Sequence, residues 1–155
     1  YKTNYKCLMP CNSYGPKDNY HNKNSHFFAA LIKKILYAKK DRKKYIEIWG
    51  SGKPKREIIY VDDIAMACLH FMKKKTKETL INIGSGKDYS IETYAKKIMK
   101  HLDVKFKIKK NKKMPDGIKR KLLDINLAKS YGWKPKIALE EGLDLTIKDF
   151  KKSFI

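Results

Sequence analysis

The apolar positions along this chain change repeatedly between strand-like and helix-like spacing. Short apolar runs bounded by Gly, Pro or polar residues predict strands at residues 6–9, 45–49, 57–61 and 80–83, and another around Phe106 and Ile108. Apolar residues recurring every three to four positions predict helices at about 26–39, 64–74, 91–102 and 139–150, with a short helix ending near Gly132. Strands that alternate with helices define the α/β class.

Polar residues before the apolar stripes mark where helices begin. Asn24 or Ser25 is a candidate cap for the first helix, either of the two acids in Val-Asp-Asp for the second, and Ser90 for the third. Cys68 lies inside the apolar run IAMACLHFM, so we expect its side chain in the core.

The two runs at 6–9 and 80–83 have the composition of buried parallel strands, which need a neighbour on each side. The chain supplies too few strands to provide those neighbours. We therefore expect an incomplete sheet, and a partner segment on the N-terminal side that is missing from this chain.

The formal net charge of +21 over 155 residues points first to nucleic acid or another anionic partner. Arg occurs only at Arg42, Arg56 and Arg120, however, and the Lys residues are spread along the chain. Because phosphate-clamping and base-reading surfaces usually draw on Arg, we interpret the charge as a solvated lysine surface. A basic nucleic-acid-binding module remains the alternative.

The three cysteines, Cys7, Cys11 and Cys68, have neither the spacing of a disulfide framework nor that of a CxxC motif. We expect no metal site and a reducing, cytoplasmic setting. No apolar run approaches the length of a membrane span, so we expect no membrane partner.

The stretch WGSGKPKREIIYVDD, residues 49–63, has the most distinctive chemistry. The Arg56 guanidinium can clamp a diphosphate through two parallel hydrogen bonds, and Trp49 can stack on a base or sugar face. The alternative is that Trp49 belongs to the core and Arg56 is a surface charge. The Gly-Ser-Gly turns at 50–52 and 84–86 lack the third glycine of a dinucleotide fingerprint, and no Tyr is followed four residues later by Lys.

Several stretches resemble a known family. The segment RE-IIYVDD resembles the R-(D/E)-(F/I)-(I/L)-(H/Y)-V-D-D motif of the extended short-chain dehydrogenase/reductase superfamily, which acts on nucleotide-linked sugars. YGPKDNYHNKNSH and MPDGIKRKLLD resemble segments of the GDP-L-fucose synthases, and INIGSGKDYSI and YGWKPKIALEEGL also fit. The similarity runs from the first residue to about residue 150.

The resemblance implies a role for particular residues. His26 matches the histidine that moves protons during epimerisation of a GDP-4-keto-6-deoxy sugar, a reaction that NADPH reduction then completes. The residues that match the segment near the nicotinamide are Pro10, Cys11, Asn12 and Ser13. The substrate-binding positions implied are Asn24, Lys34, Trp49, Arg56, Asp116 and Arg120.

This sequence also departs from the family pattern. Lys34 stands where the family commonly has Arg, Asn22 replaces a Pro, and Ile118-Lys119 replaces Thr-Pro. These differences are typical of a divergent member, or of another nucleotide-sugar epimerase or dehydratase.

The fold implied is the C-terminal, substrate-binding part of an extended short-chain dehydrogenase. Residual Rossmann strands at about 5–12 and 80–84 would be interleaved with a small sugar-nucleotide-binding α/β domain, and the N-terminal cofactor-binding half would be absent. The implied cofactor of the parent enzyme is NADP, and the implied ligand is a GDP-linked deoxy sugar. Without the glycine fingerprint and the Tyr-Lys pair, we expect no reductase activity from this chain alone. We expect self-association or a missing N-terminal half as its protein partner.

Overall fold

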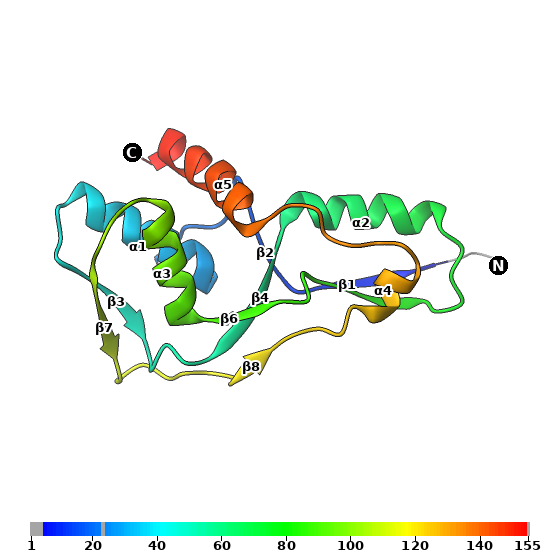
Figure 1. Cartoon of the computed structure of the whole chain (residues 1–155), viewed down its shortest axis with the longest axis horizontal. Coiled ribbons are helices and arrows are strands. Elements are labelled where there is room, and N and C mark those ends of the chain that lie inside the picture. The colour runs from blue at the N-terminus through cyan, green and yellow to red at the C-terminus, as the bar shows by residue number, and fades with distance from the viewer. Residues whose placement is uncertain (1–4, 23, 155) are drawn as a thin grey trace.

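The structure is a computed structural model that describes residues 5–22 and 24–154, and it is an elongated α/β arrangement (Figure 1). Helices α1, α3 and the β3–β7 pair lie at one end, and α2, α4 and the β1–β5 pair lie at the other. Strands β2 and β4 cross the middle and join the two ends. The expectation of an α/β fold is confirmed.

The helices within the described residues are α1 (Phe27–Lys40), α2 (Val61–Lys73), α3 (Ile91–His101), α4 (Asn126–Ser130) and α5 (Leu139–Phe154). The strands are β1 (Cys7–Pro10), β2 (Asn12–Tyr14), β3 (Tyr45–Trp49), β4 (Lys55–Tyr60), β5 (Leu80–Ile83), β6 (Asp88–Ser90), β7 (Lys107–Asn111) and β8 (Arg120–Lys121). None of the helices in this part of the chain is both long and apolar enough to cross a bilayer.

Most strand pairs are parallel, as expected where helices connect the strands. β1 pairs with β5, from Cys7 beside Leu80 to Pro10 beside Ile83. β4 is the central strand of the middle sheet: it pairs in parallel with β2 and β8 and antiparallel with β6. β3 pairs in parallel with β7. Because β1 leads into β2 through Cys11 alone, the two sheets meet at that residue.

Two hydrophobic cores hold the arrangement together. The first gathers the inner faces of α1, α3 and α5 against β3 and β4, around Phe28, Tyr94 and Phe150. The second lies where α2 and α4 pack on β5, around Phe71 and Trp133. Full burial of such a side chain contributes roughly 1.5–3 kcal/mol. Burial therefore fixes how each helix rotates about its axis.

The helix caps agree with the sequence in part. Ser90 caps α3 as predicted, since its Oγ accepts a hydrogen bond from the backbone N–H of Thr93 at 3.0 Å. The predicted caps of α1 and α2 are wrong, because His26 and Tyr60 occupy those positions with no side-chain capping bond.

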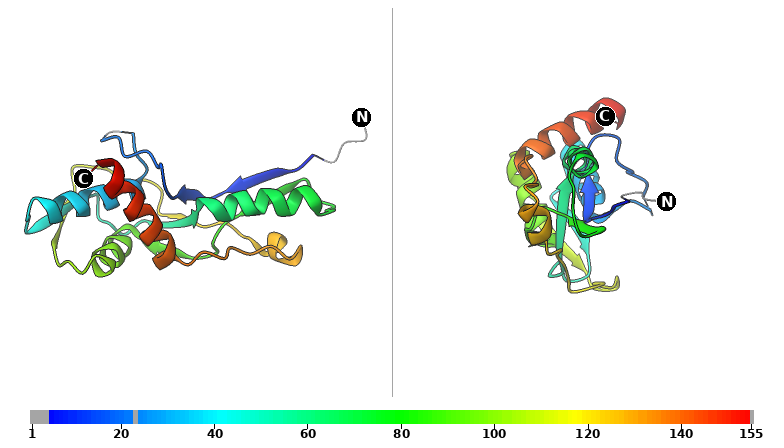
Figure 2. Two further views of the ribbon diagram at one scale, coloured as in Figure 1. Left: turned by 90° about the horizontal axis from the view of Figure 1, so that it is seen from above. Right: turned by 90° about the vertical axis from the view of Figure 1, so that its right-hand side faces the viewer.

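One burial prediction is also wrong. Cys68 lies on the exposed side of α2, because α2 turns the neighbouring Ala67 and Phe71 toward β5 instead. Strand β1 is largely exposed, at Cys7, Met9 and Pro10. Its only partner strand among the described residues is β5, so one edge carries no ladder. Figure 2 shows β1 alongside α2, at the far end of the molecule from the last turn of α5.

Candidate functional site

Three of the predicted substrate-binding residues line one cavity of about 230 Å³. Lys34 comes from α1, Trp49 from the end of β3, and Asp116 from the loop between β7 and β8. The cavity is lined by Asn22, Ser25, Phe27, Ala30, Leu31, Lys34, Ile48, Trp49, Ile91, Pro115 and Asp116. An aromatic face, an aliphatic floor and a few polar groups are what a nucleoside needs.

Trp49 is available at the mouth of this cavity. Alternation along β3 buries Ile46 and Ile48 and turns Trp49 outward, leaving it 51% exposed. The Lys34 Nζ lies 5.5 Å from the centre of the Trp49 ring and donates a hydrogen bond to the Glu47 carbonyl at 3.1 Å. Burial lowers the pKa of Lys34, and nearby Glu47 opposes that shift. An exposed tryptophan beside a held cation suits a stacked base next to a phosphate.

The β7–β8 loop is bound to the turn between β3 and β4. Asp116 Oδ1 accepts from the Ser51 backbone N–H at 2.5 Å, and Asp116 Oδ2 accepts from the Ser51 hydroxyl at 2.7 Å. These bonds, the backbone one first, hold the pKa of Asp116 below its usual value. Sequence reasoning did not single out Ser51, because nothing local shows that it meets a residue 65 positions away.

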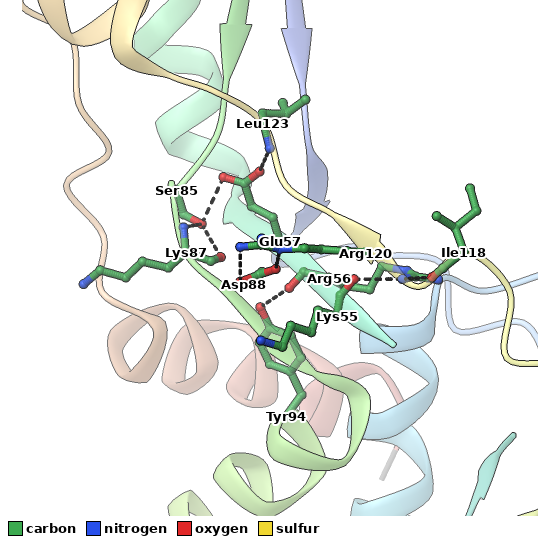
Figure 3. A network of polar contacts seen from close by, with 10 residues as sticks. All are labelled: Lys55, Arg56, Glu57, Ser85, Lys87, Asp88, Tyr94, Ile118, Arg120 and Leu123. Carbon is green, nitrogen blue, oxygen red and sulfur yellow. Dashed lines mark hydrogen bonds and ion pairs between the residues drawn. The ribbon is translucent and has the colours of Figure 1, made fainter. Parts of the chain in front are cut away.

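The Arg56 side chain contacts the same β7–β8 loop. Its Nη1 donates to the carbonyl of Ile118 at 2.6 Å and to that of Lys55 at 2.8 Å, as Figure 3 shows. An ideal Cβ at Gly117 would lie 3.5 Å from the Arg56 Nη2, so the guanidinium lies against this part of the loop. Arg56 is therefore a neighbour of the cavity wall.

The Arg120 side chain forms an ion pair with Asp88. Its Nε and Nη2 donate to the two carboxylate oxygens of Asp88 at 2.6 and 3.3 Å. The Asp88 side chain is only 9% exposed, and the hydrogen bond from Arg120 keeps the pKa of Asp88 below its usual value. The structure thus pairs Arg120 with β6, away from the residues that line the Trp49 cavity.

His26 and Asn24 stand at the start of α1, both exposed. His26 is the N-cap residue, and its carbonyl accepts the first helical hydrogen bond, from Ala30 at 3.0 Å. The next residue, Phe27, lines the cavity, so His26 is adjacent in sequence to a residue of the cavity wall.

The predicted nicotinamide segment, residues 10–13, joins the β1–β5 pair to the middle sheet. Pro10 and Ile83 end parallel strands side by side, and Asn12 and Ser13 pair with β4. Burial, and then the nearby Glu57 carboxylate, raise the pKa of the Cys11 thiol to about 12. Cys11 is therefore a neutral thiol near pH 7. In open α/β sheets, ligands bind beyond the carboxyl ends of parallel strands, which is where this segment lies.

Glu57 is a buried carboxylate that sequence reasoning did not select. It is 2% exposed and accepts a hydrogen bond from the backbone N–H of Gly86 at 2.6 Å. It also accepts one from the backbone N–H of Leu123 at 2.8 Å (Figure 3). Its side chain leaves no room for a Cβ at Gly84. It therefore joins three segments: β4, the turn after β5 and the segment after β8.

The architecture agrees with that of known proteins. Parallel strands connected by helices define an α/β fold, and a cavity of about 230 Å³ lies beside the end of β3. The profile of the NAD dependent epimerase/dehydratase family matches residues 1–84. The chain belongs to this family, which confirms the resemblance drawn from its motifs.

Relatives and solved structures with nucleotide-sugar names cover nearly the whole chain. The chain is 40% identical over 147 residues to the GDP-L-colitose synthase of Yersinia pseudotuberculosis, covering 94% of this chain and 48% of the relative. It is 38% identical over 159 residues to the GDP-L-fucose synthase of Escherichia coli K12, covering 97% of this chain and 50% of that relative. The GDP-mannoheptose C4 reductase of Campylobacter jejuni, solved with NADP bound, is 27% identical with a TM-score of 0.80, covering 97% and 54%. The chain thus spans about half the length of the curated relatives that it matches.

Proposed function

We propose that this chain is the sugar-nucleotide-binding part of a GDP-L-fucose synthase-like enzyme, which epimerises a GDP-4-keto-6-deoxy sugar and reduces it with NADPH. The observation that carries the proposal is the convergence of Lys34, Trp49 and Asp116, from three separate segments, on one cavity of about 230 Å³. The similarity to two relatives named as GDP-sugar synthases supports a GDP-linked ligand.

In this proposal the base stacks on Trp49 and the cations hold the diphosphate. Lys34 already lies within 5.5 Å of the ring centre, and Arg56 offers the planar fork that binds two phosphate oxygens at once. Lys34 in place of an arginine keeps the charge and loses the second hydrogen bond. Asn24, beside the cavity, and Arg120, once released from Asp88, are further candidate contacts to the sugar nucleotide.

His26 would be the acid–base group of the epimerisation. Protons on carbons next to a ketone are acidic enough for a positioned imidazole to remove and return, and histidine titrates near neutrality. The exposed position of His26 at the start of α1 gives it access to a ligand held in the adjacent cavity.

Reduction would need the NADP cofactor, which a related reductase holds in its solved structure. Bound NADPH would supply a hydride to the sugar carbonyl. Residues 10–13 fit the nicotinamide end, because they lie at the carboxyl ends of β1 and β5 and present a neutral thiol at Cys11. The chain carries neither a three-glycine fingerprint nor a Tyr-x-x-x-Lys pair, so alone it should not transfer hydride.

The same proposal predicts a protein partner for the β1 end of the molecule. Residues 5–12 and 80–84 would be the last Rossmann strands, and β1 has an unpaired edge within the part of the chain that the structure describes. Large apolar side chains are exposed nearby, at Met9 (47%), Leu80 (58%) and Met72 (79%). An N-terminal cofactor-binding half, or failing that a second copy of this chain, would pair with that edge and cover these side chains.

Calorimetry with GDP and with UDP tests the function. We expect GDP to bind and to change the fluorescence of the exposed Trp49, while the 5%-exposed Trp133 contributes little to the change. The Trp49→Phe variant should lose this response, and Arg56→Ala should weaken binding about tenfold or more, as expected for the loss of a charge-assisted contact. A preference for UDP would indicate another nucleotide-sugar epimerase, and no binding of either nucleotide would refute the assignment.

The second candidate, a polyanion-binding surface, is favoured by one local feature. Strand β7 and its flanks carry closely spaced lysines beside the exposed Tyr45. These are Lys105, Lys107, Lys109, Lys110, Lys112 and Lys113. This role predicts binding of single-stranded oligonucleotides that weakens steeply as salt rises. No binding at low salt would exclude it.

A further inference from the structure

Both oxygens of the Asp116 carboxylate accept hydrogen bonds from within the chain. Both of its oxygens accept hydrogen bonds from Ser51, one from the backbone N–H and one from the hydroxyl, at 2.5 and 2.7 Å. Gly50 leaves room for this contact: its φ is +64°, and any Cβ there would collide with Asp116 Oδ1. The carboxylate therefore packs against the β3–β4 turn at a position where the absence of a Cβ at Gly50 makes room for it.

This contact is one of several that pin the β7–β8 loop to the β3–β4 turn. The backbone N–H of Gly50 donates to the Asn111 carbonyl at 2.9 Å, and that of Lys55 donates to the Lys119 carbonyl at 2.8 Å. Asp116 makes the side-chain contact between these two backbone bonds. It also adds a negative charge to a cavity proposed to hold a diphosphate, where a direct contact would be repulsive.

We propose that Asp116 is a positioning residue, which acts through Ser51 to hold the β3–β4 turn and so fixes the Trp49 ring at the cavity mouth. This inference rests on the proposed nucleotide-binding function and changes the role of Asp116 within it. Trp49 directly precedes the turn that Asp116 holds. If the backbone of the turn becomes mobile, the Trp49 indole becomes mobile with it. The cavity is thereby preorganised before the base arrives, which reduces the entropy lost on binding.

A double-mutant cycle on the intact chain separates indirect from direct action. Ser51→Ala, Asp116→Ala and the double variant are compared for GDP affinity by calorimetry. We expect each single variant to weaken binding roughly three- to tenfold, and the double variant to be no weaker than Asp116→Ala. Asp116→Asn, which keeps one acceptor oxygen, should recover part of the affinity. Asp62→Ala, which removes an exposed acid at the start of α2, is the control and should bind normally.

A ligand-free measurement keeps the test independent of the proposed function. Acrylamide quenching of Trp49, corrected with the Trp49→Phe variant, should rise most in Asp116→Ala and less in Ser51→Ala, which keeps the backbone N–H bond to Asp116 Oδ1. In the double variant it should rise no further than in Asp116→Ala. If wild-type protein binds no GDP but quenching behaves this way, the positioning role stands and the proposed function fails. Unchanged quenching in Asp116→Ala, whether or not its GDP affinity falls, would overturn the positioning role.

Discussion

The Glu57 carboxylate accepts a hydrogen bond from the backbone N–H of Leu123, 66 residues farther along the chain, at 2.8 Å. A second backbone donor, Gly86, reaches the other oxygen of the same carboxylate at 2.6 Å. The salt bridges among the described residues include none at Glu57, so backbone N–H groups and the Ser85 hydroxyl, at 3.5 Å, supply its hydrogen bonds. A buried carboxylate group held in this way connects three segments beside the predicted cofactor-binding and substrate-binding residues.

Replacing Glu57 with Gln should destabilise the fold by about 1–3 kcal/mol. The amide keeps one acceptor oxygen, and its NH₂ group faces a backbone donor that is left unpaired. Urea unfolding measures the change. Glu141→Gln, an exposed acid in the first turn of α5, should shift the midpoint far less. Equal shifts in the two variants would show that Glu57 does not join the segments.

Asp63 provides a matched pair with its neighbour Asp62. Asp63 is 3% exposed and accepts from the backbone N–H groups of Lys136 at 2.8 Å and Ile137 at 3.1 Å, whereas Asp62 is exposed. Asp63→Asn should therefore cost about 1–3 kcal/mol of unfolding free energy, and Asp62→Asn well under 1. Amide exchange of Lys136 and Ile137 should accelerate only in the Asp63 variant.

The Asp88–Arg120 pair should stabilise the fold in a pH-dependent way. Because Arg120 holds the pKa of Asp88 below its usual value, the pair's contribution is present above that usual value, near pH 4, and is lost as pH falls through the lower folded value. Arg120→Met should thus be less stable than wild type at pH 7, and the difference should shrink below about pH 4.

Urea midpoints at pH 7, 5 and 3 check this dependence. Lys121→Met, which removes a charge from the next residue of β8, is the control and should show no such convergence. A difference that stays constant down to pH 3 would mean that Arg120 stabilises the fold by packing instead of by charge.

Alanine substitutions at Gly50 and Gly132 distinguish the cost of backbone strain from the cost of a steric clash. Both have positive φ, +64° and +86°, so Ala costs about 1–2 kcal/mol at either position. Only at Gly50 would the new Cβ also meet the Asp116 carboxylate, while nothing lies within 4 Å at Gly132. Gly50→Ala should therefore be more destabilising, and it alone should increase acrylamide quenching of Trp49.

The exposed apolar side of α2 should favour association. Met66, Leu69 and Met72 are 49%, 51% and 79% exposed at helical spacing. Sedimentation at increasing protein concentration should show self-association of wild type, reduced in a Leu69→Lys and Met72→Lys double variant. Replacing the exposed Lys148 and Lys152 of α5 with Gln is the control. A wild-type chain that stays monomeric throughout would contradict the prediction.

The elements that sequence predicted well are those with a strong local pattern. β3 and β5 have the predicted bounds, 45–49 and 80–83, and Ser90 caps α3 as expected. The short strands β2, β6 and β8 escaped prediction, because they are polar and only two or three residues long. Each exists through pairing with β4, and no local pattern records such pairing.

The sequence by itself determined the α/β class, most helices and the family, because periodicity and short motifs are properties of neighbouring residues. It also selected Lys34, Trp49 and Asp116 through the resemblance. Only the tertiary structure decided that these three line one cavity, that Asp116 is bound to Ser51, and that Arg120 is paired with Asp88. A carboxylate's partner depends on which distant segment folding brings within about 3 Å, and this depends on the packing of the whole chain.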